Sequence, residues 1–163
     1  MIVQPHAEPW SSEGMPGPDG CTVGILLLHG FTGSPKSMRP WGEQLAEQGW
    51  RVSVPRLPGH GTRWQDMNLT TWEDWYAEAE RALRALQESC SHVFVMGLSM
   101  GGSLTLRLAE HHADAIRGIV LVNPAVHSER WDRHFLPFLQ RFVPSFPGIS
   151  NDIAMPEIGR AHV

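Results

Sequence analysis

The sequence predicts an α/β protein with a mostly parallel sheet and helices on both faces. Four short apolar segments suited to buried strands alternate with three longer segments that have helical spacing. This alternation implies right-handed crossovers between parallel strands. Three polar, glycine-containing loops are expected at the carboxyl edge, where such sheets bind ligands. The expected strands are residues 22–28, 50–54, 92–96 and 116–122, and the expected helices are residues 37–48, 71–89 and 103–111.

Each element is predicted from its own pattern. Residues 22–28 read T-V-G-I-L-L-L without alternation, which is typical of a parallel strand covered on both faces. The segment 37–48 places its apolar residues on one face and is followed by glycine, a common helix stop. The segment 71–89 carries a long apolar stripe, and Asn68 or Thr70 is expected to cap it.

Composition limits the functions that the chain can have. At 163 residues and 42% hydrophobic content it has the size of one globular domain, and its net charge of −4 makes nucleic acid an unexpected partner. No apolar run approaches the roughly 20 residues of a membrane span, so stable membrane insertion is not expected. The first residues lack the pattern of a signal peptide, and a cytoplasmic location is expected. Cys21 and Cys90 lack metal-ligand spacing and are interpreted as buried or half-buried thiols, so no metal site is expected.

Residues 97–101 read G-L-S-M-G and stand between the apolar run at 92–96 and the helix-like run that starts at Ser103. G-x-S-x-G between a strand and a helix is the pattern of a nucleophile elbow, a sharp turn that raises the serine hydroxyl at the sheet edge. The pattern predicts Ser99 as a nucleophile. A tight structural turn is the alternative.

Residues 29–33, H-G-F-T-G, directly follow the first expected strand, and we refer to them as the oxyanion loop. Acyl transfer to a serine creates a negatively charged oxygen, which two preorganised backbone N–H groups stabilise. One donor is expected at Met100, directly after the nucleophile, and the other at Phe31. His29 is expected to orient this loop, and together with Gly30 it is a candidate for the pocket lining. A glycine-rich turn without a catalytic role is the alternative.

A second loop at the same expected edge contains P-G-H-G at residues 58–61. Its His60 is expected either to line the pocket or to brace the oxyanion loop, and a purely structural turn is equally compatible with the pattern. Trp64, Trp72 and Trp75 are interpreted as packing aromatics without a ligand role.

Three motifs in register, L-L-L-H-G-F-T-G, P-G-H-G and G-L-S-M-G-G, make residues 22–126 resemble the α/β-hydrolase superfamily. Within it, the chain is similar to bacterial carboxylesterases and monoacylglycerol-lipase-like serine hydrolases. The resemblance implies Ser99 as nucleophile and Phe31 and Met100 as oxyanion donors. It also implies hydrolysis of a small-molecule carboxylic ester through an acyl-enzyme, without metal or cofactor.

The resemblance further implies a catalytic acid and then a histidine base after the serine. Asp132 and His134 lie two residues apart on an expected helix and therefore face different sides. Asp152 and His162 have the right order but no expected strand to hold them. The acid and the base are therefore expected beyond residue 163, which would make the chain an N-terminal fragment that is inactive alone.

The expected organisation has four segments. Residues 1–21, rich in Pro, Gly and Ser, are expected to form an irregular arm, and residues 22–126 an incomplete α/β-hydrolase core. Residues 127–157 resemble the start of the family's cap. Residues 158–163 are expected to be a non-native tail, because they complete no element of the fold.

Two other functions stay open at this stage. A thioesterase or an acyltransferase would use the same nucleophile on a different substrate. A non-catalytic binding domain or pseudoenzyme would keep the elbow without its base. The sequence carries no indication of the oligomeric state.

Overall fold

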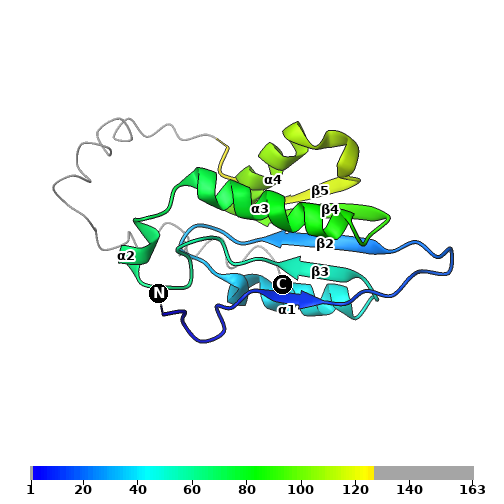
Figure 1. The fold of residues 1–163 in the computed structure, drawn as a ribbon, viewed down its shortest axis with the longest axis horizontal. Coiled ribbons are helices and arrows are strands. Elements are labelled where there is room, and N and C mark those ends of the chain that lie inside the picture. The colour runs from blue at the N-terminus through cyan, green and yellow to red at the C-terminus, as the bar shows by residue number, and fades with distance from the viewer. Residues whose placement is uncertain (1, 127–163) are drawn as a thin grey trace, which may run out of the picture. The chain divides into compact units, whose positions relative to one another are not determined.

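The computed structural model describes residues 2–126, which form a five-stranded sheet with helices on both faces (Figure 1). The strands are β1 (Trp10–Ser12), β2 (Val23–Leu28), β3 (Arg51–Val54), β4 (His92–Leu98) and β5 (Gly118–Val122). Their lateral order is β1-β3-β2-β4-β5. β2 to β5 run parallel, and β1 pairs antiparallel with β3 at one edge. The predicted α/β fold with a mostly parallel sheet is confirmed.

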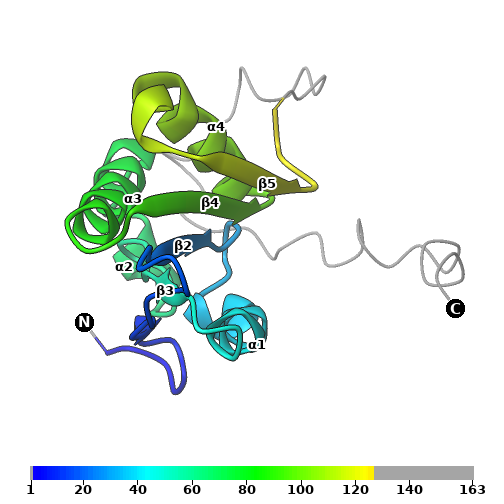
Figure 2. The same cartoon turned by 90° about the vertical axis from the view of Figure 1, so that its right-hand side faces the viewer.

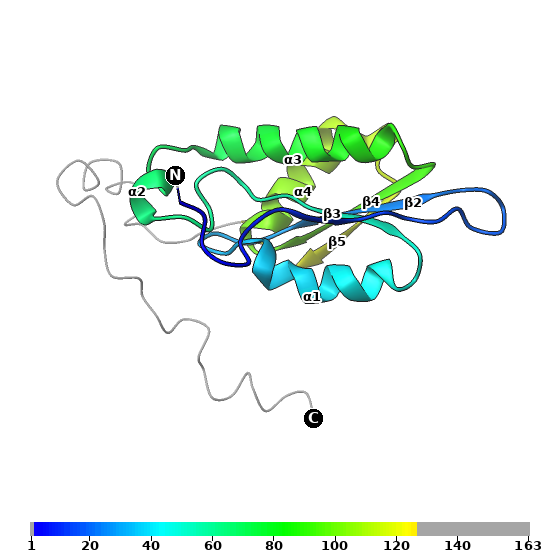
Figure 3. The ribbon, with the colours of Figure 1, turned by 60° about the horizontal axis from the view of Figure 1, so that its bottom comes forward.

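Helices cover the two faces of the sheet unequally. Helix α1 lies on one face of the sheet, and helices α3 and α4 lie together on the other (Figures 2 and 3). The short helices α2 and η1 lie in connections, α2 between β3 and α3 and η1 between α4 and β5. The helices are α1 (Pro35–Ala46), α2 (Trp64–Met67), α3 (Trp72–Gln87), α4 (Met100–His111) and η1 (Ala113–Ala115).

Strand β2 separates two hydrophobic cores, because its successive side chains point to opposite faces. Leu26 and Leu28 pack with α3 and α4, whereas Ile25 and Leu27 pack with α1. All four are at most 1% exposed, as the unbroken apolar run predicted. Burying one such side chain contributes about 1.5–3 kcal/mol to the stability of the fold. Because β2 buries side chains on both faces, it lies at the centre of both cores.

The start of α3 differs from the expected one. Its N-cap is Thr71, not Asn68 or Thr70. The Thr71 N–H donates a hydrogen bond to the Asp74 carboxylate at 2.8 Å, and this satisfies a donor at the helix start. The Thr70 hydroxyl instead donates to the Met67 carbonyl and accepts from the Trp75 indole.

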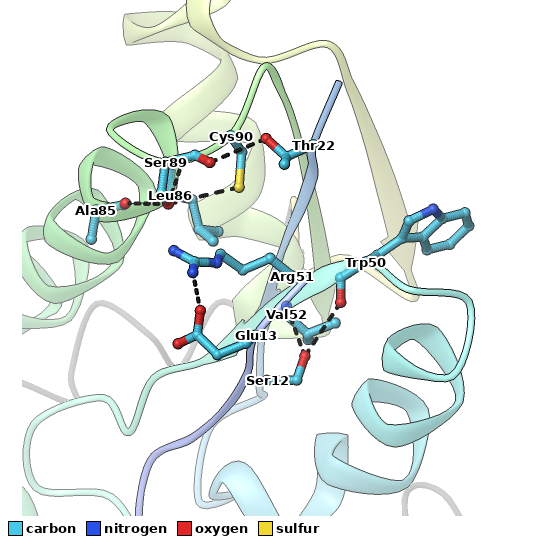
Figure 4. Close-up of polar contacts among 10 residues, drawn as sticks. All are labelled: Ser12, Glu13, Thr22, Trp50, Arg51, Val52, Ala85, Leu86, Ser89 and Cys90. Carbon is cyan, nitrogen blue, oxygen red and sulfur yellow. Dashed lines mark hydrogen bonds and ion pairs between the residues drawn. The ribbon is translucent and has the colours of Figure 1, made fainter. Parts of the chain in front are cut away.

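The segment expected to be irregular at residues 1–21 contributes β1 to the sheet. The Ser12 hydroxyl accepts a hydrogen bond from the Val52 N–H at 3.1 Å and donates to the Trp50 carbonyl at 3.3 Å (Figure 4). Glu13 forms an ion pair with Arg51 beside this pairing. The sequence did not predict this strand, because three residues, W-S-S, carry no alternating pattern of their own and become a strand by pairing with β3.

Several expectations concern features beyond the sheet. Cys21 and Cys90 are free and half-buried, as predicted. None of the helices within residues 2–126 is long and apolar enough to cross a membrane. The expected cap and tail, at residues 127–157 and 158–163, lie outside the described residues.

Candidate active site

Ser99 occupies the turn between β4 and α4 with strained backbone geometry. Its φ of 53° and ψ of −117° belong to a region that L-residues rarely adopt. The Ser99 N–H donates to the Val122 carbonyl of β5 at 2.8 Å, and its carbonyl accepts from the Gly102 N–H at 2.8 Å. The surrounding strand and helix therefore hold the serine in a conformation that it would not adopt alone, as in a nucleophile elbow.

Gly97 and Gly101 are required by close backbone approach. A Cβ at Gly97 would lie 2.5 Å from the Thr105 hydroxyl oxygen and would also overlap the Gly101 carbonyl. A Cβ at Gly101 would lie 2.7 Å from the His29 carbonyl oxygen. The G-x-S-x-G pattern thus lets α4 start directly against the end of β2 and the oxyanion loop.

The oxyanion loop passes next to the serine. A Cβ added at Gly30 would lie 3.3 Å from the Ser99 Cβ, so any larger residue there would crowd the nucleophile. Within residues 2–126, neither the Phe31 N–H nor the Met100 N–H donates a hydrogen bond. Met100 is also the first residue of α4, where the helix dipole favours negative charge. These two backbone N–H groups therefore have no hydrogen-bond partner within residues 2–126.

His29 links the oxyanion loop to the loop of residues 55–62, which we call the His60 loop. Its Nε2 accepts a hydrogen bond from the Leu57 N–H at 3.3 Å, so its Nδ1 carries the proton and donates to the Gly30 carbonyl at 3.0 Å. Burial lowers the pKa of His29 to about 4, against an ordinary value of 6.5. With both nitrogens engaged and the ring neutral, His29 orients the loop and is not free to act as a base.

His60 is fully buried next to His29, with ring centroids 5.0 Å apart. Its Nδ1–H donates to the Pro58 carbonyl at 3.1 Å, and its Nε2 has no partner within the described part of the chain. Burial lowers the pKa of this imidazole as well. The centroid of the His60 ring lies 6.0 Å from that of Phe31 and 5.0 Å from that of Trp75, so the ring packs between the oxyanion loop and α3.

Comparison with known proteins places these features in a family. The family model described as "Serine aminopeptidase, S33" matches residues 22–157 of this chain, well over half of its length. The chain belongs to this α/β-hydrolase family. The resemblance that the three motifs indicated is therefore confirmed.

Two curated relatives of this α/β-hydrolase are named as a lipase and a carboxylesterase. It is 53% identical over 120 residues to the thermostable monoacylglycerol lipase of Bacillus sp. (strain H-257), covering 74% of this chain and 45% of the relative. It is 34% identical over 104 residues to the carboxylesterase of Bacillus subtilis (strain 168), covering 63% of this chain and 42% of that enzyme. The chain thus spans about half the length of the curated relatives that it matches.

The fold agrees with a solved structure reported for LipS and LipT, two metagenome-derived lipolytic enzymes. The TM-score is 0.77 at 41% identity, covering 90% of this chain and 56% of the other. More distant structures, such as a thioesterase domain from the curacin biosynthetic pathway at 24% identity and a TM-score of 0.63, share the fold.

The structure shows no acid or base hydrogen-bonded to the Ser99 side chain among the residues that it describes. Within residues 2–126, no histidine hydrogen-bonds to the Ser99 hydroxyl; both ring nitrogens of His29 and the Nδ1 of His60 are bonded within the loops. The same stretch holds no group of three or more His, Cys, Asp or Glu side chains arranged to bind a metal ion. The candidate pairs discussed above, Asp132 with His134 and Asp152 with His162, lie outside the described residues.

The three tryptophans do not share one role. Trp64 and Trp72 are 48% and 50% exposed and therefore lie outside the core, and Trp72 packs against the ring of Tyr76. Trp75 is half-buried and contacts both Phe31 and His60. Its position three residues after Trp72 in a helical stripe gave no sign of this, because the contact depends on how α3 lies against two distant loops.

Proposed function

We propose that this chain carries the nucleophile and both oxyanion donors of a serine hydrolase that cleaves carboxylic esters. The observation that supports this most directly is the strained Ser99 together with the N–H groups of Phe31 and Met100, which have no hydrogen-bond partner within residues 2–126. Relatives named as a monoacylglycerol lipase and a carboxylesterase support esters of short or medium acyl chains, or monoacylglycerols, as the substrate class.

In the proposed reaction, the Ser99 hydroxyl attacks the ester carbonyl carbon while a histidine base, placed outside residues 2–126, takes its proton. The carbonyl oxygen becomes negatively charged and accepts hydrogen bonds from the Phe31 and Met100 N–H groups. Each donor of this kind contributes about 2.7–4 kcal/mol to transition-state stability. Loss of the alcohol leaves an acyl group on Ser99, and water then releases the acid.

Each remaining residue has a defined part in this proposal. Gly30 keeps the space next to Ser99 open, and His29 fixes the loop that presents the Phe31 N–H. His60 supports that loop from behind through ring contacts. The proposed chemistry uses no cofactor or metal, and its partner is the small-molecule ester. The expected cytoplasmic location stays a prediction.

The test uses the product of the whole open reading frame that encodes this chain. We expect it to hydrolyse p-nitrophenyl butyrate and a monoacylglycerol, and Ser99→Ala to lower turnover by about 10⁴-fold or more, because the nucleophile is lost. Ser89→Ala, at the opposite end of the sheet, is the matched control and is expected to keep wild-type turnover.

Turnover that survives Ser99→Ala would contradict the proposed function. Ser99-dependent cleavage of acyl thioesters without cleavage of esters would favour a thioesterase instead. A folded wild-type protein that cleaves neither would favour a non-catalytic role.

A further inference from the structure

Phe31 has an unusual position for an aromatic residue, because the residue is 56% exposed at the carboxyl edge of the sheet. The ring centroid lies 5.9 Å from that of Trp75 and 6.0 Å from that of His60, with an interplanar angle of 81° to His60. Thr32, the next residue, has a φ of 59°, so the backbone turns sharply just after Phe31. The Phe31 ring therefore contacts two other rings just before the backbone of this short loop turns.

Trp75 is itself firmly held. Its indole N–H donates to the Thr70 hydroxyl at 3.0 Å, and that hydroxyl donates in turn to the Met67 carbonyl at 2.8 Å. Its ring meets His60 edge to face at 5.0 Å and 77°. It also packs against the same hydrophobic core as the Met100 side chain. A half-buried ring fixed by a hydrogen bond on one side is a rigid support for a more exposed ring on the other.

We propose that Trp75 is a positioning residue for the oxyanion hole. It holds the Phe31 ring and the His60 ring together and thereby sets the direction of the Phe31 N–H toward the developing oxyanion. This inference rests on the proposed function, since it takes Phe31 as an oxyanion donor. Hydrogen-bond strength falls steeply with misalignment, so a loop that relaxes slightly loses transition-state stabilisation before it loses substrate binding.

The same helix offers a matched control. Trp72 is three residues away, is 50% exposed, and contacts the ring of Tyr76 rather than that of Phe31. Replacing either tryptophan removes the same kind of side chain from the same helix. Trp75 has a ring contact with Phe31 of the oxyanion loop, whereas the ring contact of Trp72 is with Tyr76 on its own helix.

The experiment measures kcat, KM and the inhibition constant of a trifluoromethyl ketone, which forms a tetrahedral oxyanion adduct on a nucleophilic serine. In the product of the whole reading frame, we expect Trp75→Leu to lower kcat and the affinity for the ketone about tenfold each, with KM changed less than twofold. Trp75→Phe, which keeps an aromatic ring, is expected to recover most of the loss. Trp72→Leu is expected to stay within twofold of wild type in all three quantities.

A double-mutant cycle separates positioning from a general structural role. Phe31→Ala removes the ring but keeps the N–H, so Trp75→Leu added to Phe31→Ala is expected to lower kcat less than twofold further. Multiplicative losses in the double variant, or a Trp75→Leu variant that matches Trp72→Leu, would overturn the inference. If Trp75→Leu fails to fold, Thr70→Val serves instead: it keeps both rings, removes the acceptor of the indole N–H, and is expected to lower kcat about threefold.

The two failures are distinguishable. If ester hydrolysis does not depend on Ser99, the proposed function itself fails. If it does depend on Ser99 but the Trp75 variants behave like the Trp72 control, only the positioning role fails.

Discussion

The two ends of the parallel sheet differ in backbone strain and in how their polar groups are hydrogen-bonded. At the carboxyl end, Thr32, Ser99 and Asn123 follow β2, β4 and β5, and all have positive φ although each carries a side chain. At the amino end, the positive-φ residues just before β2 and β3 are Gly20 and Gly49, which adopt this conformation without strain.

At the amino end, Thr22 hydrogen-bonds to the turn between α3 and β4. The Thr22 carbonyl accepts from the Ser91 and His92 N–H groups at 3.0 and 3.1 Å. The Thr22 hydroxyl donates to the Ser89 carbonyl at 3.1 Å, in the region that Figure 4 shows.

At the carboxyl end, by contrast, two backbone N–H groups have no described partner, and two neutral histidines are buried. Strained backbone at residues with side chains and buried histidines therefore occur together at the carboxyl end, which is also where the catalytic chemistry is proposed.

The largest expected loss of stability comes from steric overlap in the turn of residues 97–101. Gly101→Ala places a Cβ against the Leu28 and His29 carbonyls, which are backbone groups and cannot move aside, so we expect a loss of about 3 kcal/mol or more in the free energy of unfolding. A Cβ at Gly20 would have no neighbour within 4 Å, and only the φ of 77° is unfavourable for alanine. Gly20→Ala is therefore expected to lower the free energy of unfolding by about 1–2 kcal/mol. Urea denaturation measures both. Equal losses at the two ends would contradict the comparison.

A pH-dependent effect is expected from His29. Its folded pKa of about 4 lies below the unfolded value of 6.5, so the unfolded state binds more protons between these pH values. Stability is therefore full above pH 6.5 and falls as the pH drops toward 4, by about 3 kcal/mol from this group. His29→Gln is expected to reduce the slope of unfolding free energy against pH. Some slope in the same direction is expected to remain, because the pKa of His60 is also lowered by burial.

His92→Gln, at an exposed position at the amino end of β4, is the control for this measurement. Unfolding free energies measured from pH 4 to 7.5 decide the outcome. An unchanged slope in His29→Gln would show that the carboxyl end does not hold His29 neutral.

A smaller, stabilising effect is expected at Ser99. Ser99→Gly removes the strain of a side chain at φ 53°, and part of this gain is offset by the greater freedom of glycine in the unfolded chain. The net expectation is a gain of about 1 kcal/mol in unfolding free energy, together with complete loss of turnover. Ser37→Gly, inside α1, is the control and is expected to lose about 1 kcal/mol. A Ser99→Gly protein less stable than wild type would mean that the elbow is not strained.

The smallest effect is expected at the ion pair between Arg51 and Glu13. The Glu13 side chain is 84% exposed, so solvent screens its attraction to the guanidinium. Glu13→Gln is expected to change unfolding free energy by less than about 0.5 kcal/mol, measured in the same denaturation experiment. A loss above about 1 kcal/mol would show that the β1 edge contributes more than its hydrogen bonds to β3.

What the sequence predicted well depended on local patterns. The unbroken apolar run of β2 has to be buried on both faces, and G-x-S-x-G after a strand has to form a sharp turn. Features that depend on distant pairing were missed. β1 becomes a strand only against β3. The N-cap of α3 was missed although its signal is local, because Thr71 and Asp74 form a capping box that spans only three residues. The bond from the Leu57 N–H to His29, which decides the protonation of that imidazole, joins residues 28 positions apart. The ring contact between Trp75 and Phe31 is likewise non-local, so no pattern within α3 could indicate it.

The most direct test of the central claim is the site of covalent modification by a fluorophosphonate. The product of the whole reading frame is treated with the probe and digested with trypsin, and the peptide of residues 85–107 is fragmented in the mass spectrometer. We predict rapid addition of one phosphonyl group, located on Ser99 and not on Ser89, Ser91 or Ser103 of the same peptide. Labelling at another residue, or labelling of the folded protein no faster than of the urea-unfolded protein, would contradict the claim that the carboxyl end of the sheet activates Ser99.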